Sequence, residues 1–119
     1  MARILLAEDD DALRRFLGAA LARAGHQVVS VADGRAGLAA MADARFDLLL
    51  ADVIMPGIDG LDLARRAILE HPDTRVMFIT GFAAVALAGA RLPQARSQPA
   101  SKPFHLRDLV GQVDRLLAA

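Results

Sequence analysis

The chain has 119 residues, of which 55% are hydrophobic and 24% charged, and its formal net charge is +0. This length and hydrophobicity indicate one ordinary domain with a buried core and exclude a disordered chain. The balanced charge does not fit a strongly basic nucleic-acid-binding protein, and the absence of cysteine excludes disulfides, thiol catalysis and cysteine-based zinc sites.

The N-terminal segment MARILLAEDD reaches acidic residues after only a few apolar positions. It therefore matches neither a signal peptide nor a membrane span. We expect a cytoplasmic protein that contacts neither a membrane nor nucleic acid.

The first half of the chain alternates short apolar runs with helical periodicity. Residues 4–7 (ILLA) predict a strand, and a helix follows whose apolar stripe consists of Leu13, Phe16, Leu17, Ala20, Leu21 and Ala24. Gly25 stands where a left-handed helix cap belongs. The β-branched run 27–31 (QVVSV) predicts a second strand, and Asp33 is the expected N-cap of a second helix.

The second half continues the alternation. The run FDLLLAD at 46–52 suits a strand buried on both faces, because its leucines are consecutive. Further elements are predicted in this order: a turn at 55–60, a helix ending at His71–Pro72, a strand at 75–80, a short helix at 82–90, a weak strand at 97–101, and a helix at 106–117.

Five strand–helix units joined by short connections predict an α/β fold, with a doubly wound parallel sheet and helices on both faces. Such sheets bind their ligands at the carboxyl ends of the strands. Polar residues follow or end several predicted strands at this edge: Glu8, Asp9, Asp52, Thr80 and Lys102. We therefore expect these five side chains to converge on one site.

Carboxylates gathered in one place repel one another, and a hard divalent cation such as Mg²⁺ relieves that repulsion. A lysine and a threonine beside them favour phosphoryl chemistry, with Lys102 and the hydroxyl of Thr80 contacting phosphoryl oxygens. Asp52 is the best candidate nucleophile, because it ends the central and most buried strand. Asp9 is the expected direct metal ligand, and Glu8 is expected to act through water.

Four segments, ILLAEDD, DLLLADVIMPGIDGLDL, VMFITG and SKPF, resemble in order and spacing the signature segments of bacterial response-regulator receiver domains. The resemblance covers essentially the whole chain. It implies a single receiver domain over residues 1–119 without an output domain. The implied fold is flavodoxin-like, a (βα)5 arrangement with strand order 2-1-3-4-5.

The resemblance also implies residue roles. Asp52 matches the phosphoacceptor, which takes its phosphoryl group from a histidine kinase or a histidine phosphotransfer protein. Asp9, Asp52 and the backbone carbonyl of Ile54 match the Mg²⁺ ligands, and Glu8 matches the acidic residue that supports them through water. Thr80 matches the switch hydroxyl and Lys102 the phosphoryl-binding lysine.

One position departs from the family pattern. Receivers usually carry an aromatic residue three positions before the lysine, and this chain has Pro99 there. Proline in a strand is tolerated mainly at a sheet edge, which is where the fifth strand is expected. The usual coupling between the switch hydroxyl of Thr80 and that aromatic ring therefore cannot operate in its ordinary form.

Among single-domain receivers, the segments AEDD, FITGFAA and SKPFHLRDLV are similar to the CpdR type of cell-cycle regulators. The resemblance implies an adaptor in regulated proteolysis, with a ClpX-type component of the ClpXP protease as partner. Two alternatives stay open: a phosphate shuttle or sink, and a receiver module excised from a hybrid histidine kinase. A magnesium-dependent small-molecule phosphatase is disfavoured, because Ile54 stands where such enzymes place a second catalytic aspartate.

Other polar residues have structural interpretations. Asp10 and Asp11 are expected to cap the first helix and Asp59 the third. The three histidines, His26, His71 and His105, have no metal-ligand spacing and are expected to be exposed or capping residues. The pairs Arg14–Arg15 and Arg65–Arg66 are expected on solvated helix faces.

Overall fold

A computed structural model of the chain describes residues 2–52, 55, 58–80, 97–101 and 106–118. Its elements, in chain order, are β1 (Arg3–Ala7), α1 (Asp11–Arg23), β2 (Gln27–Val31), α2 (Gly34–Asp43), β3 (Leu48–Asp52), α3 (Gly60–Glu70), β4 (Arg75–Thr80), β5 (Ser97–Ser101) and α5 (Leu106–Ala118). The short helix predicted at 82–90 lies outside the described residues.

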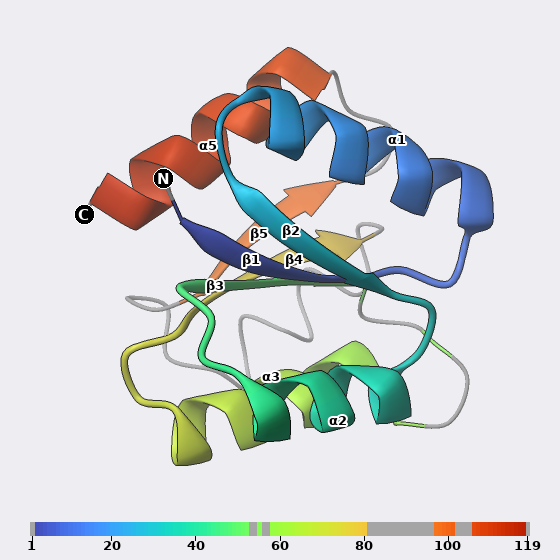
Figure 1. The fold of residues 1–119 in the computed structure, drawn as a ribbon, viewed down its shortest axis with the longest axis vertical. Coiled ribbons are helices and arrows are strands. Elements are labelled where there is room, and N and C mark those ends of the chain that lie inside the picture. Colours follow the sequence, from blue (N-terminus) through green and yellow to red (C-terminus); the bar gives the residue numbers. More distant parts are fainter. Residues whose placement is uncertain (1, 53–54, 56–57, 81–96, 102–105, 119) are drawn as a thin grey trace.

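The five strands form one sheet in the order β2-β1-β3-β4-β5, and every neighbouring pair is parallel. Figure 1 shows α1 and α5 on one side of this sheet and α2 and α3 on the other. The predicted fold class, strand order and two-sided covering by helices are therefore confirmed. The weak strand expected at 97–101 is β5, and it forms an edge of the sheet as its proline requires.

The core consists of two apolar layers that meet at the sheet. Leu48 and Leu50 of β3 pack with apolar residues of α1 and α5, whereas Leu49 and Ala51 pack with those of α2 and α3. Every residue of β3 is buried, because successive side chains point to opposite faces and helices cover both. The consecutive leucines of β3 are explained by this burial on both faces of the sheet.

Aspartates begin three of the helices, as the sequence predicts. Asp10, Asp33 and Asp59 each accept a hydrogen bond at 2.8–2.9 Å from the backbone N–H three residues further on. Asp11 does not share in this capping but follows as the first residue of α1. Gly25 has φ 99°, the left-handed conformation expected after α1.

Two members of the predicted apolar stripe, Phe16 and Ala24, are exposed and are not part of the core. Leu17 and Leu21 are fully buried, whereas Phe16 is 61% exposed. Consecutive helical residues differ by about 100° around the axis, so a helix that centres Leu17 on the core turns Phe16 toward its flank. The expectation that Phe16 lies on the buried face was wrong.

The start of α2 is packed tightly against the connection between β3 and α3. Gly34 is buried, and a Cβ placed on it would lie 1.9 Å from the backbone oxygen of Ile58. Because the obstacle is backbone, no side-chain rotation can relieve it. The absence of a side chain at Gly34 therefore allows the start of α2 to lie directly against the backbone of Ile58.

We predict opposite effects for two glycine-to-alanine substitutions. Gly34→Ala should lower the free energy of unfolding by about 2–3 kcal/mol, because it forces the backbone around Ile58 to move. Gly111→Ala in α5 should raise it by about 0.5–1 kcal/mol, because a Cβ there meets, among the described residues, only the flexible side chain of Arg115, at 3.4 Å. Urea unfolding measures both, and equal midpoints for wild type and Gly34→Ala would contradict the packing.

Candidate functional site

Acidic residues gather where β1 and β3 end. Glu8 and Asp9 directly follow β1, and Asp52 is the last residue of β3. The two strands are neighbours, with Ala7 paired to Ala51, so the register brings Glu8 level with Asp52. The carboxyl-end edge predicted from the sequence is therefore where these three residues meet.

One carboxylate oxygen from each of Glu8, Asp9 and Asp52 lies within 4.8 Å of the other two. Glu8 is fully buried, Asp52 is 8% exposed and Asp9 lies at the surface. The three residues, called the acidic cluster below, thus run from the protein interior to solvent. A small group that approaches from solvent reaches Asp9 and the exposed part of Asp52 first.

The electrostatics of the acidic cluster favour a cation. Two like charges 4 Å apart repel by about 1 kcal/mol in water and by about 4 kcal/mol near a protein surface. Three carboxylates pay this cost for each pair unless a positive charge or a proton offsets it. Oxygen donors in this arrangement are the ligands that Mg²⁺ prefers.

The turn after β1 is held by an arginine that the sequence interpretation had assigned to solvent. The Arg14 side chain is only 17% exposed, and its Nη1 donates to the backbone carbonyl of Glu8 at 2.9 Å. Its Nη2 donates to Oδ1 of Asp11 at 2.6 Å, and this hydrogen bond lowers the pKa of the Asp11 carboxyl. The sequence pattern of α1 does not predict the contact between Arg14 and Glu8, because the turn that joins β1 to α1 determines where the two residues lie relative to each other.

The remaining predicted site residues are placed only in part. Thr80 is the last residue of β4, and the register sets Asp52 beside Ile79, so the Thr80 backbone reaches the same sheet edge as the acidic cluster. Its side chain, together with Lys102, Pro103 and Ile54, lies outside what the structure describes. Their predicted roles stay predictions.

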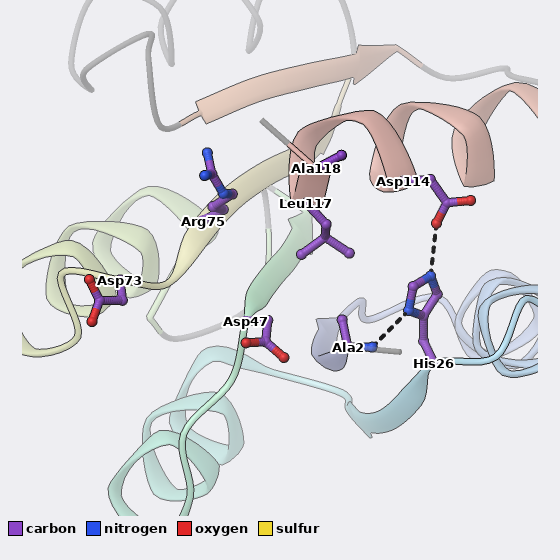
Figure 2. Close-up of a pocket in the computed structure, with 8 residues that line it drawn as sticks. All are labelled: Ala2, His26, Asp47, Asp73, Arg75, Asp114, Leu117 and Ala118. Carbon is purple, nitrogen blue, oxygen red and sulfur yellow. Dashed lines mark hydrogen bonds and ion pairs between the residues drawn. The ribbon is translucent and has the colours of Figure 1, made fainter.

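A pocket of about 450 Å³ lies at the opposite, amino-terminal ends of the strands (Figure 2). There the His26 side chain is 8% exposed, with Nδ1 accepting from the Ala2 N–H at 3.2 Å and Nε2 lying 2.9 Å from Asp114. The expectation of an exposed or capping His26 was wrong, because tertiary packing brings the N-terminus and α5 together around it. Both ring nitrogens have partners, so His26 joins α5 to the sheet.

No helix in the described part of the chain is long and apolar enough to cross a membrane.

Residues 4–114 match the family model described as "Response regulator receiver domain". The chain is 49% identical to the response regulator receiver protein CpdR of Brucella abortus, over all of this chain and 99% of that protein. It is 35% identical to a stretch of the sensor kinase CckA of the same organism, over 98% of this chain and 12% of CckA. A solved response regulator receiver protein from Sinorhizobium medicae has a TM-score of 0.89 and 30% identity, covering 98% of this chain and 94% of that one.

Neutralising one member of the acidic cluster should stabilise the protein when no divalent cation is present. We expect Asp9→Asn, measured in chelator at low ionic strength, to raise the free energy of unfolding by at most about 1 kcal/mol, because Asp9 is exposed and solvent screens its charge. Added salt should shrink the gain. Asp73→Asn, at an exposed acid outside the cluster, is the matched control, and an equal gain there would contradict the repulsion.

Proposed function

Because the chain belongs to the response regulator receiver domain family, we propose that Asp52 accepts a phosphoryl group in a two-component phosphorelay. The donor is a phosphohistidine of a histidine kinase or a histidine phosphotransfer protein. The observation that carries the proposal is the acidic cluster, in which the Asp52 carboxylate lies beside two others at the carboxyl ends of the strands. Similarity to CpdR and to part of CckA supports the phosphorelay setting.

In the proposed transfer, a carboxylate oxygen of Asp52 forms a bond to phosphorus while the phosphorus–nitrogen bond of the donor breaks. The imidazole nitrogen keeps the electron pair and takes up a proton, and Asp52 becomes an acyl phosphate. Little covalent chemistry is needed from other residues, because phosphoryl transfer depends mainly on alignment and charge neutralisation. The limited exposure of Asp52 restricts attack to the side that faces solvent.

The donor set of the acidic cluster fits Mg²⁺. Asp9 and Asp52 would bind it directly together with the backbone carbonyl of Ile54, and Glu8 would act through water. When bound, Mg²⁺ supplies positive charge that offsets the carboxylates and the phosphoryl oxygens. Arg14 holds the backbone of Glu8 and thereby fixes the turn that carries Glu8 and Asp9.

We assign the other phosphoryl contacts to Lys102 as a point charge and to the Thr80 hydroxyl as a hydrogen-bond donor. The chemistry is then confined to the protein itself: it catalyses its own phosphoryl transfer and its own dephosphorylation. A small-molecule phosphatase is disfavoured, since Ile54 offers no acid–base group. Pro99, which pairs with Phe78 in the sheet, implies that the response to phosphorylation differs from the usual aromatic switch.

The proposed output is contact with another protein, most simply a ClpX-type protease component, as in CpdR-like adaptors of regulated proteolysis. The match over nearly the whole of CpdR supports a receiver that acts as a single domain. A phosphate shuttle or sink is the alternative, and so is a receiver module of a hybrid kinase, in line with the match to part of CckA.

Incubation with a small phosphodonor and Mg²⁺ should add the mass of one phosphoryl group to the wild type. Asp52→Asn should gain none, because an amide oxygen is a poor nucleophile. Asp10→Asn should still be labelled, because Asp10 caps α1 and asparagine caps equally well. Intact mass spectrometry measures all three, and equal labelling of wild type and Asp52→Asn would refute the acceptor role.

A pull-down separates the adaptor from the shuttle. We expect immobilised unphosphorylated wild type and Asp52→Ala to retain a purified ClpX-type component, and wild type treated with phosphodonor and Mg²⁺ to lose it. Treated Asp52→Ala should keep its partner, which controls for effects of the donor itself. Absence of retention in every state would favour the shuttle.

A further inference from the structure

The outer edge of β2 carries backbone groups that face away from the sheet. β2 is an outermost strand of the sheet and, within the described residues, pairs with β1 alone. The N–H of Gln27 donates to the backbone just before β1 at 2.8 Å, and the carbonyl of Val31 accepts from the residue just after β1 at 3.1 Å. Alternate residues of a strand point their backbone groups to opposite sides, so those of Val28 and Ser30 point outward.

This edge lacks three of the features that usually protect sheet edges from pairing. Proteins blunt exposed edge strands with charged residues, proline or bulges. The opposite edge of the sheet, β5, contains Pro99, whose nitrogen has no hydrogen to donate. β2 (QVVSV) has neither a charge nor a proline, keeps a regular register with β1, and leaves Val29 39% exposed. It is therefore competent to pair with another strand.

A groove of about 340 Å³ runs between this edge and α1. Val28 and Ser30 line it from β2, and Arg14 and Arg15 line it from α1, together with small residues that include Gly18. The helix lies close to the strand there, since a Cβ on Gly18 would lie 3.3 Å from the Ser30 hydroxyl oxygen. The groove thus combines outward backbone groups, an apolar side chain and two guanidinium groups.

The charge of the groove selects its occupant. Arg14 forms an ion pair with Asp11, whereas Arg15 is exposed and forms no ion pair with any described residue. The pKa of the Asp11 carboxyl is lowered mainly by Arg14 and, to a smaller extent, by the charge of Arg15. The β2 strand of a second copy (QVVSV), paired edge to edge, would present no acidic side chain to the guanidinium group of Arg15. An extended segment rich in acidic residues does present them, and its carboxylates can pair with the guanidinium groups.

We propose that the groove between α1 and β2 binds an extended acidic segment of another protein, which adds to the sheet as a strand beside β2. Strand addition of this kind draws affinity from main-chain hydrogen bonds and specificity from side-chain contacts. Val28 and Ser30 supply the main-chain partners and Arg15, with Arg14, selects for acid. The groove adjoins the turn that carries Glu8 and Asp9, because Arg14 lines the groove and also donates to the carbonyl of Glu8. The proposal nevertheless does not depend on phosphorylation of Asp52.

A fluorescein-labelled peptide of alternating glutamate and valine is the probe, and a lysine–valine peptide is its control. We expect saturable binding of the acidic peptide by fluorescence anisotropy, weakened by salt, and the largest amide chemical-shift changes at residues 28–30. Methylating alternate peptide nitrogens should weaken binding, because it removes strand hydrogen bonds. Failure to saturate, equal binding of the lysine peptide, or shifts confined to other elements would overturn the proposal.

Selection by charge and main-chain pairing with β2 can be tested by separate substitutions. Arg15→Glu should weaken binding about tenfold, whereas Arg23→Glu, an exposed arginine of α1 that does not line the groove, should change it less than about twofold. Ser30→Pro removes the outward N–H and leaves the pairing with β1, so it should weaken binding while the thermal midpoint shows that the fold persists.

Equal losses for Arg15→Glu and Arg23→Glu would overturn the charge selection. Concentration-dependent self-association that Ser30→Pro abolishes would assign the edge to a second copy of the chain and also overturn the proposal.

Discussion

Burial of β3 on both faces is the constraint on which the rest of the structure depends. Three consecutive leucines of this strand are fully buried, and burial of each contributes about 1.5–3 kcal/mol. A strand in the middle of a sheet covered by helices on both sides buries such a run, because successive side chains point to opposite faces. The same placement puts the last residue of the strand, Asp52, at the carboxyl end of the sheet, between β1 and β4.

Packing of the apolar core thus brings together three carboxylates that repel one another. Glu8, Asp9 and Asp52 are held together because the strands that end beside them are held together, despite the repulsion between their carboxylates. The energy of the core offsets that repulsion. The cation and the phosphoryl group proposed for this site would change its balance of charge, beside a turn that Arg14 holds through the carbonyl of Glu8. A change of charge at this site alters the interactions among the three carboxylates, and a local charge event of this kind is what a switch requires.

The two edge strands of the sheet, β5 and β2, differ in their capacity to pair with another strand. At β5, Pro99 limits pairing and replaces the aromatic residue that receivers usually have. At β2, uncharged β-branched residues leave the edge competent to pair, beside arginines on α1. Arg14 contributes to this groove and also holds the carbonyl of Glu8, so one side chain contacts both regions of the molecule.

Local patterns were sufficient for the elements and for part of the site. The leucine run predicted the central strand, aspartates predicted three helix caps, and Gly25 predicted a left-handed turn, because each depends on a few neighbouring residues. The gathering of Glu8, Asp9 and Asp52 also followed, since parallel strands must end at a common edge. The contacts of Thr80, Lys102 and Ile54 remain predictions, because their side chains lie outside the described residues.

The sequence by itself therefore determined the order of strands and helices along the chain and the end of the sheet at which the acidic residues meet. Only the tertiary structure decided that Phe16 faces solvent, that His26 is buried against Ala2 and Asp114, and that Arg14 holds Glu8. The physical reason is range: periodicity and capping act over a few residues, whereas these contacts depend on how helices rotate and pack against the sheet. His26 and Asp114 lie 88 positions apart, a separation that no local pattern spans.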